Sequence, residues 1–206
     1  MNHVATVIGA LAVAGAATAQ IELLPDPAIE IGSGAASAPP GATEWGFFGA
    51  AGINAFFGDN GHLSFFADNP SNSGGAFHQG IGGSAGFEYT FTLVDVFVEP
   101  RFNADLQIAL EFYAGDDSTQ LGVETLIIDT DDDTTPIGFS GGPFASVSAI
   151  APVGTVFVRP VIQFSNPAPL SGGGGPNFFV FAASLVPSPA VAPAMLCMAL
   201  GVRRRR

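Results

Sequence analysis

The stretch Ala104–Phe112, ADLQIALEF, decides the fold class. Its large apolar residues alternate with polar or small ones, which is the period-two pattern of a half-buried β-strand. Turn-forming residues follow at Gly115–Ser118, and Leu121–Ile128 then resumes as a second strand. The centre of the chain is therefore predicted to consist of consecutive strands joined by a tight turn.

The same alternation extends on both sides of this pair. Phe87–Val98 is predicted to be a strand with a bulge near Val94, where the parity of the apolar residues changes. Val156–Phe164 is another, in which Pro160 favours an edge or a bulge. Shorter or later candidates are Gly46–Phe57, His62–Ala67, Phe144–Ile150 and Phe178–Val186. Many short strands with Gly and Pro between them predict an all-β protein, an antiparallel β-sandwich or jelly roll.

The two ends differ from this body. The first 19 residues have an apolar run, Val4–Ala14, and small residues before an expected cleavage between Ala19 and Gln20, as in a secretory signal peptide. The last residues are a short apolar run and four arginines. We expect a signal helix at 1–19, one sandwich domain at 20–185, and a tail with a short hydrophobic segment at 186–206.

The charge of the body is strongly acidic. All eighteen acidic residues lie between the two ends, with only Arg101 and Arg159 of the six basic residues. Because such a surface repels phosphate, we expect no nucleic-acid partner and no direct docking on anionic lipid. The one cysteine, Cys197, lies in the tail, so the body is expected to form no internal disulfide.

Two glycine-rich motifs match the consensus sequences of known sites but lack the helix that follows the motif in those sites. Gly138–Gly142 satisfies G-x-S-x-G, but a strand-like segment follows it instead of a helix, and no histidine comes after Ser140. Gly80–Ala85 approximates a dinucleotide fingerprint, again without a helix after it. Both are predicted to be turns.

A cation site is weighed at the acidic run that begins at Asp129. Asp129, Asp131 and Asp133 occupy the first, third and fifth positions of a calcium loop, but the glycine and glutamate of an EF-hand are absent. The two interpretations that stay open are a looser calcium site and a solvated loop. His62 and His78 have no metal-ligand spacing and are expected at the surface or in turns.

The tail resembles a PEP-CTERM sorting segment. The matching residues are the motif Val186, Pro187, Ser188 and Pro189 and the terminal cluster Arg203, Arg204, Arg205 and Arg206. The resemblance implies an exported bacterial protein of the cell surface or extracellular matrix. It also implies a transient inner-membrane association, with the arginines cytoplasmic, and an exosortase-type processing enzyme as partner.

The body resembles carbohydrate-binding-module-like jelly rolls related to galactose-binding domains. The resemblance is carried by Glu22–Glu30, Thr43–Trp45, Phe77–Ile81 with Gly86–Phe91, Leu110–Asp116, Ala151–Thr155 and Phe179–Val186. It implies a structural calcium held in part by Glu30. In the closing strand, however, Phe181 and Ala182 stand where relatives carry aspartates, so our expectation is no cofactor, with calcium as the alternative.

The function expected from these observations is a non-catalytic surface or matrix protein that binds glycan or exopolysaccharide. Sugars stack on exposed aromatic rings, and Trp45, with Phe47 and Phe48 nearby, is the candidate platform. The alternative for these rings is burial in the core. Two other functions stay open: a structural or adhesive surface protein without a ligand site, and an exported hydrolase, although the sequence indicates no catalytic group.

Overall fold

The computed structural model describes residues 21–24, 29, 45–49, 51–54, 62–66, 73–78, 81–98, 104–116, 118–129, 138–165 and 177–189. All regular elements among them are β-strands, in antiparallel pairings. Within these ranges no helix has the length and hydropathy needed to cross a bilayer. The expected signal helix at 1–19 and the hydrophobic segment after residue 189 lie outside the described residues.

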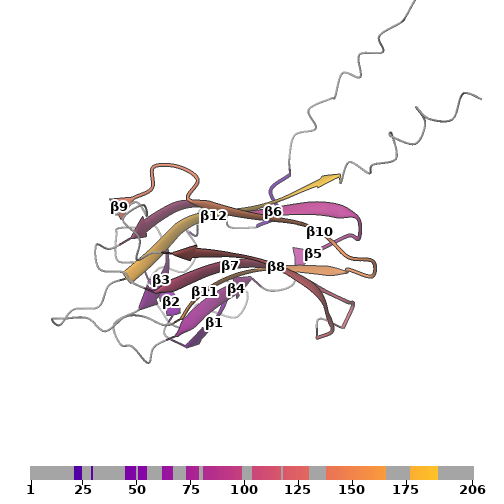
Figure 1. Cartoon of the computed structure of the whole chain (residues 1–206), viewed down its shortest axis with the longest axis horizontal. Coiled ribbons are helices and arrows are strands. Elements are labelled where there is room, and N and C mark those ends of the chain that lie inside the picture. Colours follow the sequence, from indigo (N-terminus) through magenta and orange to yellow (C-terminus); the bar gives the residue numbers. More distant parts are fainter. Residues whose placement is uncertain are drawn as a thin grey trace, which may run out of the picture.

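The strands form two sheets that face each other as two layers (Figure 1). The first sheet has the order β1-β4-β11-β7-β8, with β5 on β11, and the second has the order β10-β6-β12-β3-β2, with β9 on β6. In the first sheet the bounds are β1 Trp45–Gly49, β4 Gly74–His78, β5 Ile81–Gly82, β7 Asp105–Tyr113, β8 Gln120–Asp129 and β11 Phe157–Ser165. In the second they are β2 Ala51–Asn54, β3 His62–Phe66, β6 Phe87–Val98, β9 Gly138–Phe139, β10 Ala145–Ile150 and β12 Asn177–Pro189. The prediction of an antiparallel all-β sandwich is confirmed.

The core lies between the sheets and is built from the inward residues of each strand. The alternation in ADLQIALEF places Leu106, Ile108 and Leu110 inside with no exposed surface. Phe65 of the second sheet packs edge-on against Phe164 of the first, with ring centroids 6.4 Å apart. The period-two pattern thus becomes one apolar layer shared by both sheets.

The bulge predicted near Val94 is confirmed. The pairing of β6 with β12 shifts register where Asp95 faces Ala182 and Leu93 faces Ala183. Val94 and Asp95 are both half-buried, while the buried residues change parity on either side of them. One strand thereby keeps apolar residues in the core despite the change of phase in its sequence.

Pro160 does not lie at a sheet edge, which corrects one of the two alternatives given for it. It belongs to β11, which has β4 and β5 on one side and β7 on the other. β4 pairs from Val161 onward and β5 pairs up to Val158, so Pro160 lies between these two pairings. A proline fits here because the described ladder on that side needs no N–H from it.

The segment predicted as one strand at Gly46–Phe57 contains two strands in different sheets. β1 pairs with β4 in the first sheet, whereas β2 pairs with β3 in the second. Gly49 ends β1 with a φ of 62°, and a Cβ there would overlap the carbonyl oxygen of Ser73. A glycine is therefore required where the chain leaves the first sheet.

Both glycine-rich motifs contain a short strand, so their prediction as simple turns was incomplete. Ile81–Gly82 is β5 and pairs with the start of β11. Gly138–Phe139 is β9 and pairs with the end of β6. The backbone N–H of Ser140 then donates to the Val96 carbonyl, and the Val96 N–H donates to Ser140 Oγ at 3.3 Å. This serine has a structural contact at the sheet.

The described N-terminal residues are tied to the closing strand. The Glu22 carboxylate accepts hydrogen bonds from the Leu185 N–H at 2.8 Å and from the Ser184 hydroxyl. The Leu23 N–H donates to the Leu185 carbonyl at 2.9 Å. β12 then continues to Pro189, four residues beyond the end expected for the domain. Val186–Pro189 of the proposed sorting motif therefore belong to the sheet.

Candidate functional site

The three aromatic residues that the sequence indicated as a platform all lie in β1, but they do not point to the same side of the sheet. Trp45 lies opposite His78, with its ring edge-on at 5.3 Å between centroids, and only 6% of it is exposed. Phe47 packs against the core, whereas Phe48 points outward and is 44% exposed. Trp45 is thus a core residue, and its interpretation as an exposed platform is wrong. Of the three, Phe48 alone presents a ring to solvent.

Two phenylalanine rings lie flat on the outer side of the first sheet. A Cβ placed on Gly75 would overlap the Phe48 ring, and one placed on Gly46 would overlap the Phe77 ring. β1 and β4 are hydrogen-bonded neighbours, so each ring covers the glycine of the other strand. Aromatic rings commonly cover glycines in sheets in this way. The result is a pair of rings held against the backbone by the lack of side chains beneath them.

A cation lies beside these rings. The Arg159 guanidinium carbon is 5.3 Å from the centroid of Phe77 and 4.3 Å from that of Tyr113, on opposite flanking strands. Its Nη1 is 4.0 Å from Glu111 Oε2, and the Tyr113 hydroxyl donates to the same oxygen at 2.7 Å. The four side chains form one arrangement, in which stacking on two rings holds the guanidinium plane in place.

Burial and the Glu111 carboxylate shift the titration of Tyr113. Burial raises the pKa of the phenol to about 12, and both the hydrogen bond to Glu111 and its negative charge act in the same direction. The Arg159 charge opposes this shift but is outweighed. Tyr113 therefore stays a neutral hydrogen-bond donor throughout the physiological pH range.

The outer side continues as a row of small and amide side chains. Val161 and Ala109 face each other next to Arg159, and Gln163 and Gln107 face each other one step further. The two aliphatic residues are buried, while the glutamines are half-buried. We call this surface the outer aromatic face. It comprises Phe48, Phe77, Arg159, Tyr113, Glu111, Gln107 and Gln163.

Chemically, the outer aromatic face combines flat apolar rings with edge donors and acceptors. Phe48 offers an exposed ring face beside the half-buried ring of Phe77, Arg159 offers guanidinium N–H groups, and the glutamines offer both donors and acceptors. This combination suits a ligand that has one apolar face and many hydroxyl groups.

Sequence reasoning found only Phe48 of this face. The missed residues come from β4, β7 and β11, and their common side is set by the register of pairing. One local signal was present, because G-x-F occurs at Gly46–Phe48 and again at Gly75–Phe77. In adjacent strands running in opposite directions, that repeat places each ring over the other strand's glycine.

The remaining candidates are separate from this face. Glu30, Asp131 and Asp133 lie outside the described residues, and Asp129 ends β8 with no described side chain. No group of three potential metal ligands occurs among the residues that the structure describes. Ala19, Gln20 and the cluster Arg203–Arg206 also lie outside those residues. His62 and His78 are buried in different sheets, which corrects their expected surface or turn positions.

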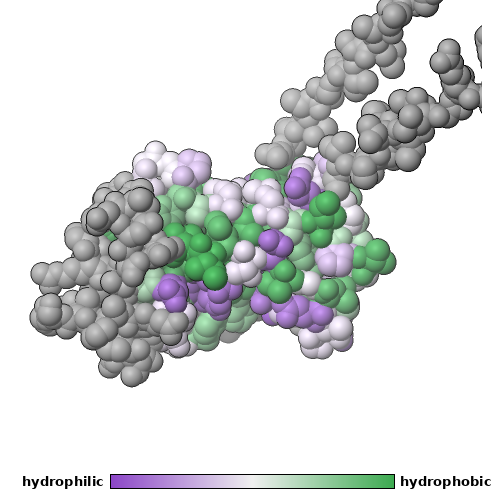
Figure 2. Space-filling model, in the orientation of Figure 1, coloured by the Kyte–Doolittle hydropathy of each residue, from purple (hydrophilic) through white to green (hydrophobic). Residues whose placement is uncertain are grey.

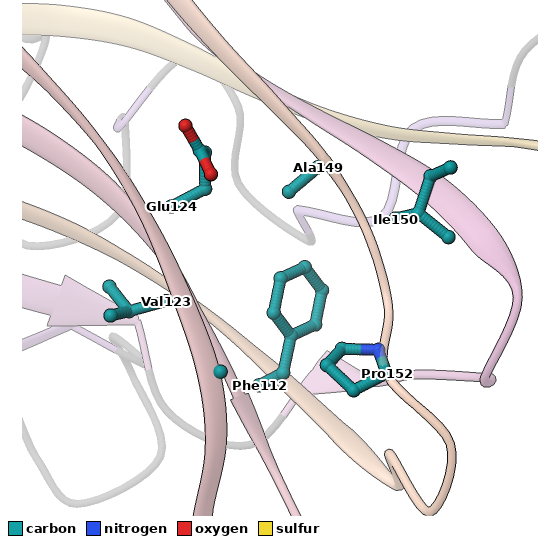
Figure 3. A pocket seen from close by; sticks show the side chains of 7 residues that line it. Phe112, Val123, Glu124, Ala149, Ile150 and Pro152 are labelled. Atoms are coloured by element: carbon teal, nitrogen blue, oxygen red, sulfur yellow. The ribbon is translucent and has the colours of Figure 1, made fainter.

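A hollow of about 310 Å³ lies where the edge strands of the two sheets face each other (Figure 3). The Phe112 ring lies between β8, with Val123 and Glu124, and the end of β10 with its following loop. Gly122, opposite Phe112, contributes no side chain, and Pro152 is close to it. The hollow is mainly apolar, with the Glu124 carboxylate as its charged group.

Comparison with known proteins gives no family. No protein-family model matches the chain, and no curated protein matches it. Similar solved structures include a family 16 carbohydrate-binding module, with 10% identity over 67% of this chain and 86% of that one, at a TM-score of 0.45. The CBM22-1 xylan-binding domain from Paenibacillus barcinonensis Xyn10C has 12% identity, and the match covers 84% of this chain and 97% of that domain at a TM-score of 0.43. The enzymatically active domain of bacteriophage CBA120 tailspike protein 4 has 10% identity at a TM-score of 0.45. The match covers 69% of this chain but only 19% of the tailspike chain.

Proposed function

We propose that the chain is an exported, non-catalytic jelly-roll module that binds polysaccharide on the outer aromatic face. The observation that carries the proposal is the pair of flat rings, Phe48 and Phe77, laid over glycines beside the stacked Arg159. A pyranose has an apolar ring face and polar edges, so it would stack on a phenylalanine while the guanidinium and the amides bind its hydroxyls.

An uncharged polysaccharide suits this face better than an acidic one. The body of the chain is strongly acidic, and the cation of the face, Arg159, already has the Glu111 carboxylate 4.0 Å away. An acidic polymer would be repelled by the overall charge of the protein. The expected ligand is therefore a neutral glycan chain of the cell surface or extracellular matrix.

The location that we propose rests on the ends of the sequence. The signal-like residues 1–19 would direct export, and the residues from Val186 would act as a sorting tail for an exosortase-type enzyme after a transient inner-membrane stage. Because Val186–Pro189 pair with β6, we propose that processing takes place after Pro189 and leaves the sheet intact.

Replacement of Phe48 by alanine tests the binding face. Phe48→Ala should weaken binding to a neutral polysaccharide about tenfold, since loss of one ring contact of roughly 1.4 kcal/mol is one decade in affinity. The matched control is Phe87→Ala, because Phe87 is 40% exposed but starts β6 in the other sheet. Isothermal calorimetry is the suitable measurement, as Trp45, the only tryptophan, lies in the core.

The panel of ligands should include xylan, a soluble β-glucan, a galactan and the acidic polymer alginate. Binding of the folded protein to none of the neutral polymers would refute the proposal. Equal losses for Phe48→Ala and Phe87→Ala would also refute it, because the two rings lie on different sheets.

A second candidate is a structural or adhesive surface protein without a glycan site. It is favoured by the burial of Trp45 and the inward packing of Phe47, since these rings act in the core. The same panel distinguishes the two, because this candidate requires that no polymer binds.

A further inference from the structure

β8 is the outermost strand of the first sheet as described. Nine of its ten residues pair with β7 from Asp105 to Tyr113, and no described strand pairs with its other side. Within the described part of the chain, the backbone groups on that side have no strand partner. A long unpaired edge is a template for association unless side chains block it.

The outward row of β8 is apolar and exposed. Val123 is 53% exposed and Ile127 is 67% exposed, with the exposed Thr125 between them. All three are β-branched, so they suit a paired strand. The strand contains no proline, lysine or arginine, which are common devices for protecting an edge.

The row is symmetric about Thr125. In an antiparallel pairing of two copies with Thr125 opposite Thr125, Val123 of each copy lies opposite Ile127 of the other. Cross-strand pairs of β-branched residues stabilise such a contact. We propose that β8 pairs with β8 of a second copy of this chain in this register, as a twofold dimer with one continuous sheet.

The charges of the strand are compatible with this register. Glu124, the charged residue of β8 whose side chain is described, would lie opposite Leu126 of the other copy. The two Glu124 carboxylates are then diagonal neighbours, and each lines the hollow of its own copy, where it is exposed to solvent (Figure 3). Direct opposition of like charges is avoided.

The size of the contact indicates a modest affinity. In this register residues 121–129 of each copy pair, and nine residues at about 3.4 Å each give a contact about 31 Å long. A single strand pair with its flanking side chains lies near the lower limit of specific interfaces, about 1,000 Å². We therefore expect a dissociation constant in the micromolar range.

The pairing has a consequence for ligand binding. Residues directly opposite in antiparallel strands lie on the same side of a sheet, so Val123, Thr125 and Ile127 of both copies share one side. That side is the one that carries Arg159 and Glu111, which continue the same row across β7 and β11. Both outer aromatic faces of the dimer would point in one direction.

A disulfide-trapping experiment on the full chain tests the register. In a Cys197→Ser background, Thr125→Cys should form a disulfide-linked dimer on mild oxidation, because directly opposite Cα atoms are about 4.5–5.5 Å apart. Val123→Cys alone and Ile127→Cys alone should remain monomeric on non-reducing gels. A mixture of these two variants should link, and this pattern distinguishes the register from association through the tail.

Sedimentation equilibrium of the unmodified chain and of Ile127→Lys provides the second measurement. The unmodified chain should dimerise, and Ile127→Lys should raise the dissociation constant at least tenfold, with circular dichroism confirming its fold. Val153→Lys, at an exposed turn outside β8, should leave the dissociation constant of the dimer unchanged. A monomeric chain at about 100 µM, or linkage in Val123→Cys alone but not in Thr125→Cys, would overturn the proposal.

Discussion

His62 is a histidine held in an aromatic environment. It has no exposed surface, and its ring lies 4.9 Å from that of Phe179 and 5.1 Å from that of Phe181, measured between centroids. Burial lowers the pKa of this imidazole below its ordinary value of 6.5, because the charged form loses its hydration. The folded protein therefore holds His62 neutral where the unfolded chain would bind a proton.

This difference predicts a loss of stability in mild acid. The contribution is fully present above pH 6.5 and is lost as the pH falls through 6.5 towards the lowered pKa of the folded state. Urea unfolding between pH 7.5 and 5.5 should show a fall of at most about 1.4 kcal/mol per pH unit from this one proton. His62→Gln should remove that part of the slope, and an unchanged slope in the variant would contradict the assignment.

β12 is the element that joins the most distant parts of the chain. It pairs with β6 and β3, and its residue Leu185 binds the described N-terminal residues through Glu22. The sequence-based boundary at 185 would cut this strand before its last four pairs, in which Val186 faces Thr90 and Pro189 faces Phe87. As a unit of folding, the sandwich extends to Pro189.

Two truncations test this boundary. A chain that ends at Pro189 should melt within a degree or two of the full chain, since it keeps every pair of β12. A chain that ends at Leu185 should melt several degrees lower, because lost pairs cost roughly 1 kcal/mol for each net hydrogen bond, and 1 kcal/mol corresponds to about 2–4 °C at this size. Equal melting temperatures by calorimetry would show that Val186–Pro189 contribute nothing to the fold.

At the scale of the whole molecule, the two proposals combine into bivalent binding. Two outer aromatic faces on one side of a continuous sheet could engage the same polymer, and linkage of two weak sites raises the apparent affinity without new contacts. Ile127→Lys should then bind an immobilised polysaccharide at least tenfold more weakly than the unmodified chain.

The control for this prediction is a short oligosaccharide of the same polymer. Its affinity in calorimetry should be the same for Ile127→Lys and the unmodified chain, because one molecule cannot span two faces. Equal binding of both proteins to the immobilised polymer, with Ile127→Lys shown to be monomeric, would contradict bivalency.

The face of the molecule seen in Figure 2 carries apolar groups among polar ones. The large exposed apolar residues of the described chain are Ile21, Phe48, Phe87, Val123, Leu126, Ile127, Ile150, Val153 and Val156. Four of the nine lie in β1 or β8, the strands that carry the two proposed contacts. Composition alone could not separate these residues from the core, because both sets are apolar.

The aromatic run WGFF at Trp45–Phe48 marks the limit of sequence reasoning about the site. Adjacent residues of a strand point to opposite faces, so Phe47 and Phe48 could never have shared one platform. The alternation does not reveal which of them points inward. That choice follows from Phe47 lying opposite Ala76, which is fully buried, while Phe48 lies opposite Gly75.

The sequence by itself determined the strands with clear alternation, the bulge near Val94 and the apolar side of ADLQIALEF, because alternation and turn residues act within a few positions of the chain. It did not predict β4, whose Gly74–His78 has no such alternation. Only the tertiary structure decided that Phe48, Phe77, Tyr113 and Arg159 form one surface and that Trp45 lies in the core. Those residues lie in four strands, and the register between strands distant in sequence is set by packing of the whole sandwich.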